Sequence, residues 1–219
     1  MDPMCANYAP TRPDRLRAVF GVSPERDDYV DDSYPGHVAP VIVGAGGARR
    51  AELAVFGLIP PWSRDSRNFR QCYNARSETV GEKPSFRHAW KSRQWCAVPA
   101  DGFYEPNYET GKAVRWRIES ADDEPLVIAG LWERWRAPTG QWSTSFTMLT
   151  INADAHPLMS RFHAPGDEKR SLVLLEPSQL DQWLQADLEQ AQQMLRPFDP
   201  AAVRCFPAPR PPRAVKPKA

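Results

Sequence analysis

The chain has 219 residues, of which 42% are hydrophobic and 25% are charged, and its 28 basic residues nearly cancel its 27 acidic ones. This balance excludes a disordered chain and a coiled coil, and any nucleic-acid contact must come from local clusters of cations. No apolar run approaches the ~18 residues of a membrane helix, and the start lacks a signal-peptide pattern. We therefore expect a cytoplasmic protein that does not contact a membrane.

The four cysteines, Cys5, Cys72, Cys96 and Cys205, lie far apart and form no C-x-x-C pair. A zinc knuckle and a thioredoxin-type redox motif are therefore not indicated, and we expect four reduced thiols. The 23 prolines are about twice the average share, which disfavours long helices and favours short strands joined by fixed turns. The composition therefore predicts a β-rich protein.

The first predicted element is a short helix after Thr11, which is placed to cap it. Leu16, Val19 and Phe20 fall on one face of this helix, and Gly21 is a suitable C-terminal stop. This pattern predicts one amphipathic helix near the N-terminus.

A hairpin follows, with strands at 38–43 and 53–56 and a turn at Gly46 and Gly47. Val114, Trp116 and Ile118 then alternate with charged residues, as in a half-buried strand. Further short strands are predicted at 126–129, 146–151 and 172–175.

Apolar residues recur at helical spacing from Ser178 to Arg196, between Pro177 and Pro197, and predict one long helix. Because strands come in groups with few helices between them, we expect an α+β fold. It would be one β-rich domain over 4–206, with mixed or antiparallel sheets, a barrel-like core and a few flanking helices. The Pro-, Arg- and Lys-rich segment 207–219 is predicted to be an extended, flexible tail.

The sequence contains no Gly-rich phosphate loop, no H-E-x-x-H and no G-x-S-x-G. Polar residues in aromatic or turn-rich segments remain as candidates: Asn74, Arg76, Glu105 and His163. We expect no metal and no small-molecule cofactor.

Four segments carry a resemblance to a known family: MCANY at 4–8, YNARSET at 73–79, CAVPADGFYE at 96–105 and LMSRFH at 158–163. In this order they resemble the motifs of the SOS-response-associated peptidase (SRAP) family, and the similarity spans 4–206. The resemblance implies a domain that senses abasic sites in single-stranded DNA and links itself to them through an N-terminal cysteine.

A terminal cysteine carries an amine and a thiol that can reach one carbon. The amine would condense with the sugar aldehyde, and the thiol would then close a thiazolidine. With ordinary pKa values of about 8 and 8.5, a useful fraction of each group is expected to be reactive near neutral pH without extreme tuning. Met1, Asp2 and Pro3 precede Met4, so Cys5 becomes terminal only if translation starts at Met4 or if its thiol removes the leader. The sequence leaves both routes open.

The resemblance makes Glu105 the general acid and base, and its aromatic neighbours predict a raised pKa. Asn74 would orient the amine, and His163 would protonate the sugar ring oxygen or assist the imine. His156 is the alternative histidine, but Pro157 beside it suits a structural turn.

DNA phosphates are expected to contact five arginines: Arg64, Arg67, Arg70, Arg76 and Arg161. Trp62 and Phe103 are candidate stacking surfaces for bases. The core is expected to contain five other tryptophans: Trp90, Trp116, Trp132, Trp135 and Trp183.

The expected partner is single-stranded DNA that contains an abasic site, bound by a monomer that is nucleoid-associated when on DNA. Two alternatives stay open. One is a cysteine peptidase or autopeptidase that pairs Cys5 with His163 or Glu105, and the other is a noncatalytic module that binds single-stranded DNA.

Overall fold

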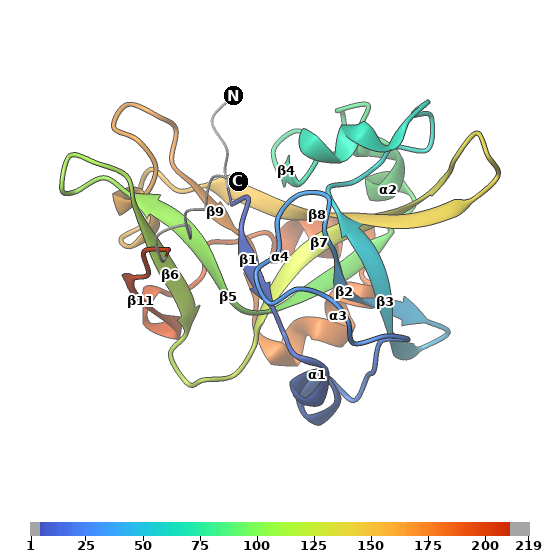
Figure 1. Ribbon diagram of the computed structural model, residues 1–219, viewed down its shortest axis with the longest axis horizontal. Helices are drawn as coiled ribbons and strands as arrows, with labels where there is room; N and C mark the ends of the chain where they lie inside the picture. The colour runs from blue at the N-terminus through green and yellow to red at the C-terminus, as the bar shows by residue number, and fades with distance from the viewer. Residues whose placement is uncertain (1–4, 211–219) are drawn as a thin grey trace, which may run out of the picture.

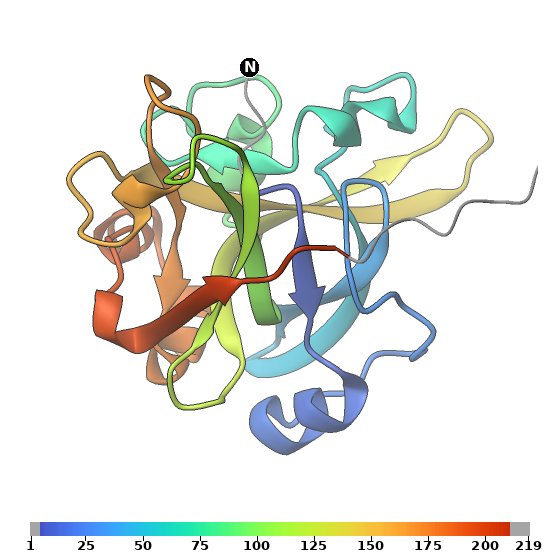
Figure 2. The ribbon, with the colours of Figure 1, turned by 60° about the vertical axis from the view of Figure 1, so that its left-hand side comes forward.

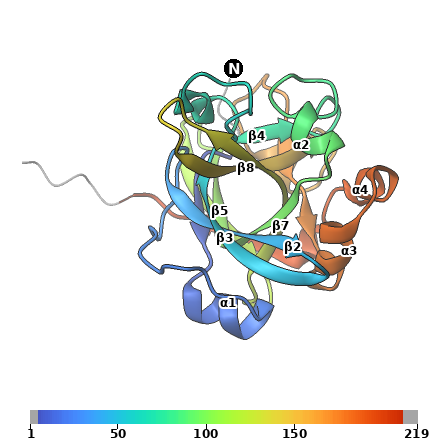
Figure 3. The same cartoon turned by 90° about the vertical axis from the view of Figure 1, so that its right-hand side faces the viewer.

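The computed structural model describes residues 5–210, which form one domain around an 11-stranded sheet (Figure 1). Five strands close into a barrel because β5 pairs with β7 as well as with β2. Figure 3 looks into this ring, which consists of β2 (Val38–Ala45), β3 (Ala48–Phe56), β5 (Trp95–Asn107), β7 (Leu126–Arg136) and β8 (Trp142–Asn152). Since β3 and β8 run parallel and the other barrel pairs antiparallel, the sheet is mixed. The predicted β-rich, barrel-like fold is confirmed.

The other strands extend the barrel at its edges. They are β1 (Tyr8–Pro10), β4 (Asn74–Arg76), β6 (Val114–Ser120), β9 (Arg170–Leu172), β10 (Leu174–Leu175) and β11 (Val203–Pro207). The predicted hairpin at 38–56 is confirmed with its turn at Gly46 and Gly47, as are the later predicted strands. The prediction at 172–175 becomes two strands, β9 and β10, on either side of Val173.

The α-helices are α1 (Pro13–Phe20), α2 (Arg87–Lys91), α3 (Leu180–Gln185) and α4 (Leu188–Met194). Four short 3-10 helices connect the larger elements: η1 (Ser66–Arg70), η2 (Met159–Arg161), η3 (Pro177–Gln179) and η4 (Pro200–Ala202). None of the helices in the described part of the chain has the length and apolar character that a membrane crossing requires.

Helix α1 confirms the first predicted element, including its stop, because Gly21 has the left-handed φ of 69°. Its N-terminus differs from the prediction. Arg12, rather than Thr11, occupies the capping position and makes no side-chain cap, so Pro13 sets the first turn. Leu16 and Phe20 are buried as expected, whereas Val19 is 38% exposed.

The single helix predicted over 178–196 is wrong, because the chain breaks between α3 and α4. Asp187 starts the second helix as its N-cap: its side chain accepts a hydrogen bond from the backbone of Gln190, whose side chain accepts one from the backbone of Asp187. This reciprocal capping box satisfies two backbone donors and stabilises the break.

Strand β5 separates two hydrophobic clusters because successive side chains of a strand point to opposite faces. Trp95 and Ala97 join the cluster that also contains Trp183 of α3. Cys96 and Val98 join the second cluster, which also contains Cys5. All four cysteines are free thiols, as expected.

The domain continues past residue 206, where the boundary was predicted. Pro207 still pairs with Trp116 in the β11–β6 ladder, and the backbone of Ala208 donates a hydrogen bond to the carbonyl of Arg115 (Figure 2). The guanidinium group of Arg210 lies 5.0 Å from the ring centroid of Tyr34. Residues 207–210 are therefore part of the domain, and the rest of the predicted tail lies outside the described residues.

Candidate functional site

Cys5 lies just before β1, and the pairing of β1 with β5 brings it to the site. Tyr8 pairs with Phe103, and the carbonyl of Asn7 accepts a hydrogen bond from the backbone of Tyr104 at 3.0 Å. The same carbonyl accepts the Cys5 thiol at 3.6 Å. Cys5 is only 2% exposed, so this register holds its thiol inside the domain, next to residue 105.

The carboxyl group of Glu105 is 4% exposed and interacts with the Cys5 thiol. Burial raises the pKa of Glu105 to about 8, although the contact with the thiol acts in the opposite direction. The pKa of Cys5 is raised well above its ordinary value by burial and then by the charge of Glu105. Burial and the charge of Glu105 therefore favour the protonated thiol, in contrast to the partial ionisation expected from its ordinary pKa.

His163 follows η2, and its imidazole ring lies next to the carboxyl group of Glu105. Its Nε2 donates a hydrogen bond to the carbonyl of Arg170 at 3.1 Å, which leaves Nδ1 unprotonated, 3.8 Å from Oε2 of Glu105. Burial lowers the pKa of His163. Because both groups are shifted toward their neutral forms, the contact at neutral pH is between a neutral imidazole and a largely protonated carboxyl group.

The backbone of His163 has a φ of 64°, a left-handed conformation that is uncommon for residues other than glycine. Its N–H donates a hydrogen bond to the carbonyl of Pro106 at 2.9 Å, and its carbonyl accepts one from Nζ of Lys169. These two bonds hold the imidazole against β5 at some conformational cost, which is typical of functional positions.

His156, the alternative histidine, has both ring nitrogens engaged in a turn. Its Nδ1 accepts hydrogen bonds from the backbone of Leu158 and Met159, and its Nε2 donates one to the carbonyl of Phe198 at 3.1 Å. This arrangement fits the structural turn expected for His156.

Tyr73 and Asn74 complete the cluster. Tyr73 packs against the cluster that contains Cys5, and its pKa is raised by burial and then by the charges of Cys5 and Glu105. Tyr73 lies in one of the four segments that carry the family resemblance, but no role was predicted for it. The amide of Asn74 is buried, and neither of its polar atoms has a partner among residues 5–210. An amide with both polar atoms free is available to bind a polar group of a substrate.

The sequence model of the SOS response associated peptidase (SRAP) family matches residues 4–210. The chain belongs to the SRAP family. A SRAP relative, abasic site processing protein YoqW of Bacillus subtilis, is 33% identical over 162 residues, which are 72% of this chain and 69% of the relative. Mouse abasic site processing protein HMCES is 27% identical over 127 residues, 45% of this chain and 36% of HMCES.

The fold is also found among solved structures. A protein of Bordetella bronchiseptica is 35% identical to this chain and superposes with a TM-score of 0.86, over 93% of this chain and 99% of that protein. A protein of Bacteroides thetaiotaomicron has 21% identity and a TM-score of 0.80, and therefore supports the fold alone.

In this SRAP domain, two of the predicted phosphate-binding arginines lie close to the site, and each is paired with a carboxylate. Arg76 contacts Glu168 at 2.8 Å, and Arg161 contacts Glu109 at 2.8 Å. Arg76 lines a cavity of about 610 Å³ together with Asn74 and His163. Any anion that enters this cavity competes with Glu168 for Arg76.

Arg170, which was not among the predicted site residues, also lines this cavity. Its side chain is almost fully buried and forms ion pairs with Glu78 and Glu168 at 2.8 and 2.9 Å. Its carbonyl accepts the hydrogen bond that orients His163. An arginine seven residues after the histidine is the only signal of this role in the sequence.

The predicted residues of segment 62–70 lie on the surface. Trp62 is 59% exposed, and its indole donates a hydrogen bond to the carbonyl of Pro84, which lines the same cavity. Arg67 pairs with Asp65, whereas Arg64 and Arg70 are exposed. Trp62 is therefore available for stacking at the rim.

The prediction that Phe103 stacks on a base does not fit the structure. Its exposure is 0%, and it packs within the second hydrophobic cluster, so a base cannot reach its ring. Among the tryptophans expected in the core, Trp90, Trp135 and Trp183 are buried, whereas Trp116 and Trp132 are only partly buried.

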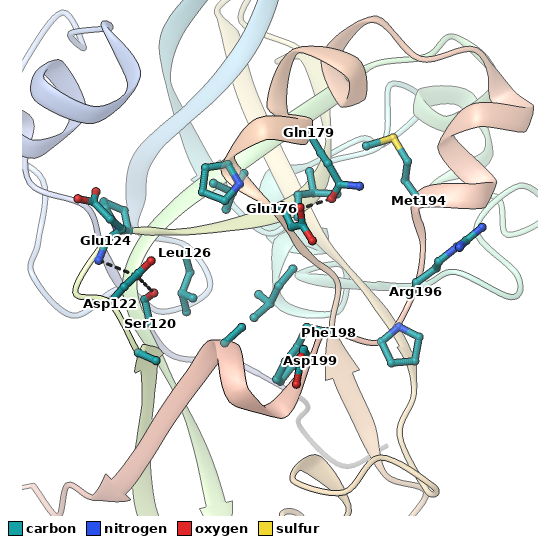
Figure 4. Close-up of a pocket in the computed structure, with 18 of the residues that line it drawn as sticks. Ser120, Asp122, Glu124, Leu126, Glu176, Gln179, Met194, Arg196, Phe198 and Asp199 are labelled. Atoms are coloured by element: carbon teal, nitrogen blue, oxygen red, sulfur yellow. Dashed lines mark hydrogen bonds between the residues drawn. The ribbon is translucent and has the colours of Figure 1, made fainter.

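A separate cavity of about 810 Å³ opens between the β6–β7 turn, η3 and α4 (Figure 4). Its lining includes Asp122, Gln179 and Arg196, but none of Cys5, Tyr73, Asn74, Glu105 and His163. Among residues 5–210, no three His, Cys, Asp or Glu side chains are grouped so that they could hold a metal ion.

Proposed function

We propose that this SRAP chain captures abasic sites in single-stranded DNA as a covalent thiazolidine formed by the amine and the thiol of Cys5. The observation that carries the proposal is the buried contact between the Cys5 thiol and the carboxyl group of Glu105, whose pKa is about 8. The two relatives described above are named abasic site processing proteins.

The reaction needs two bonds to one carbon. The α-amine of Cys5 adds to the aldehyde of the ring-opened sugar, and the resulting hydroxyl group leaves as water to give an imine. The thiol sulfur then adds to the imine carbon while its proton is transferred to nitrogen. The net change is the loss of one water.

Glu105 is suited to move these protons. With a pKa of about 8, both of its forms are populated near neutral pH. The ionised form takes a proton from the thiol or from the ammonium group, and the protonated form donates one to the departing hydroxyl group. Nδ1 of His163 accepts a proton that passes between Glu105 and the sugar oxygen.

Asn74 and Arg76 have positioning roles in this proposal. The unpartnered amide of Asn74 binds the free amine of Cys5 or the sugar hydroxyl group. Arg76 exchanges its contact with Glu168 for a DNA phosphate. Trp62 stacks on a neighbouring base at the rim.

The mechanism requires a free α-amine on Cys5, so residues 1–4 must be omitted in translation or removed. In the second route, the Cys5 thiolate attacks the carbonyl carbon of Met4, and the nitrogen of Cys5 leaves with a proton. One water then hydrolyses the thioester. Glu105 serves as the base for this step as well, because the thiol is otherwise protonated.

The test is incubation of the protein with a single-stranded oligonucleotide that contains one abasic site, followed by a denaturing gel. The proposal predicts a shifted band that is absent for Cys5→Ala. Cleavage of an added peptide without a shifted band would instead favour a cysteine peptidase. Reversible, salt-sensitive binding that Cys5→Ala retains, without a covalent band for the wild type, would favour a noncatalytic DNA-binding module.

A further inference from the structure

A second cavity, of about 410 Å³, is lined by Glu105, whereas Asn74, Arg76 and His163 line the cavity of about 610 Å³ described above. The two cavities share no lining residue. The wall of the second cavity consists mainly of Asn7, Tyr34, Tyr104, Glu105, Arg115 and Arg210. Because residues that neighbour Cys5 line each cavity, a DNA strand whose lesion sits at Cys5 can extend into both.

Arg115 lines this second cavity and is held in place by several contacts. Its guanidinium group lies 3.3 Å from the ring centroid of Tyr104 and donates to Oδ1 of Asn7, to the carbonyl of Ala208 and to Asp32. All of its nitrogen atoms have partners and Asp32 balances its charge, so Arg115 is structural.

Arg210 differs from Arg115 and from the arginines of the first cavity. It is exposed, its guanidinium carbon lies 5.0 Å from the ring centroid of Tyr34, and it donates a hydrogen bond to the Tyr34 hydroxyl group. Within residues 5–210 it has no carboxylate partner, whereas Arg76 pairs with Glu168 and Arg170 pairs with Glu78 and Glu168. Arg210 also lines the second cavity.

A cation–π contact and a hydrogen bond to the same tyrosine restrict the orientation of a guanidinium group, and its remaining donors then suit the two oxygens of a phosphodiester. Strand β11 sets this position, because it pairs with β6 along its length (Figure 2) and ends only three residues before Arg210, which contacts Tyr34. The segment predicted to be a tail thus supplies a cation beside the site.

We propose that Arg210, held by Tyr34, binds a backbone phosphate of the DNA strand on the side of the abasic site opposite to Arg76. This inference rests on the proposed function and names the residue that binds the second flank of the same strand.

The test uses two fluorescent oligonucleotides with a tetrahydrofuran abasic analogue, which cannot form an aldehyde and so reports noncovalent binding alone. One carries nucleotides only on the 5′ side of the analogue and the other only on the 3′ side. For Arg210→Ala, we expect a roughly three- to tenfold loss of affinity for one oligonucleotide and less than a twofold change for the other. The slope of log affinity against log salt should fall by about 0.7 for the affected one.

Arg196→Ala is the matched control, because Arg196 is also exposed and removal of either side chain changes the net charge equally. Arg196 lines the separate cavity shown in Figure 4. Arg210→Lys should restore part of the lost affinity. Unchanged binding by Arg210→Ala, an equal loss for both oligonucleotides, or the same loss in Arg196→Ala would overturn the subsite.

The wild type separates this outcome from failure of the proposed function. A wild type that binds the analogue but forms no crosslink with a natural abasic site refutes the covalent chemistry, while the comparison of Arg210 variants still decides the subsite. A wild type that binds neither oligonucleotide refutes both.

Discussion

Nδ1 of His163 lies 3.8 Å from Oε2 of Glu105, although the two residues are far apart in the sequence. A β-bridge between Asn107 and Phe162 and the hydrogen bond from the backbone of His163 to Pro106 bring their segments together. Burial shifts both groups toward their neutral forms. The pair is therefore better suited to transfer a proton than to stabilise the fold as an ion pair.

Glu105→Gln should slow crosslink formation by roughly 100-fold or more, because an amide cannot exchange the proton. Affinity for the tetrahydrofuran oligonucleotide should stay within about twofold, since the substitution keeps shape and volume. Single-turnover gel kinetics and fluorescence anisotropy measure the two quantities. Glu124→Gln, at an exposed turn residue, is the control, and an unchanged rate for Glu105→Gln would remove Glu105 from the mechanism.

Glu105 should also make the fold less stable as pH rises. Its pKa is about 8 in the folded chain and near 4.5 when unfolded, so between these values the folded chain holds a proton that the unfolded chain has lost. The free energy of unfolding should therefore fall by up to about 1.4 kcal/mol per pH unit relative to Glu105→Gln. Urea titrations of both proteins between pH 5 and 8 test this, and parallel curves would contradict the raised pKa.

The two histidines should separate activity from stability. His163→Asn, which tolerates the left-handed backbone, should slow crosslinking by roughly 100-fold with little loss of DNA affinity. His156→Ala should instead lower the free energy of unfolding by about 2 kcal/mol or more, because backbone groups at 158 and 159 lose a buried acceptor. A slower rate for properly folded His156→Ala, with His163→Asn unaffected, would reverse the assignment.

The catalytic groups were predicted from local sequence segments. Such segments do not show how distant strands pair, and this pairing decides which side chains are buried. The pattern around residue 105 suggested a raised pKa, but whether the Cys5 thiol is buried depends on the β1–β5 register, which no local pattern encodes. Phe103 is buried because it alternates with the partly exposed Tyr104 along β5 and turns toward the second hydrophobic cluster.

Strand β5 itself was not predicted, because Pro99, Gly102 and Pro106 interrupt its pattern. The helix break at Asp187 was missed for the opposite reason: apolar spacing continues across it, and the capping pair with Gln190 outweighs that periodicity. The hairpin at 38–56 and helix α1 were predictable because their turn and stop residues are local.

Glu168 should act as a competitor for DNA at Arg76. Glu168→Gln should raise affinity for single-stranded DNA by roughly two- to fivefold, consistent with an exposed ion pair of at most about 1 kcal/mol. Arg76→Ala should weaken binding, and adding Glu168→Gln to it should give no further gain. Anisotropy titrations of the three variants test this, and intact affinity in Arg76→Ala would make Arg76 structural.

The measurement that tests the central claim most directly is the intact mass of the denatured adduct formed with an abasic oligonucleotide. The account predicts the mass of the chain from Cys5 onward plus that of the oligonucleotide, less one water, and no adduct with Cys5→Ala. An adduct that still contains residues 1–4, or one that Cys5→Ala also forms, would contradict capture by an amine and a thiol on the same residue.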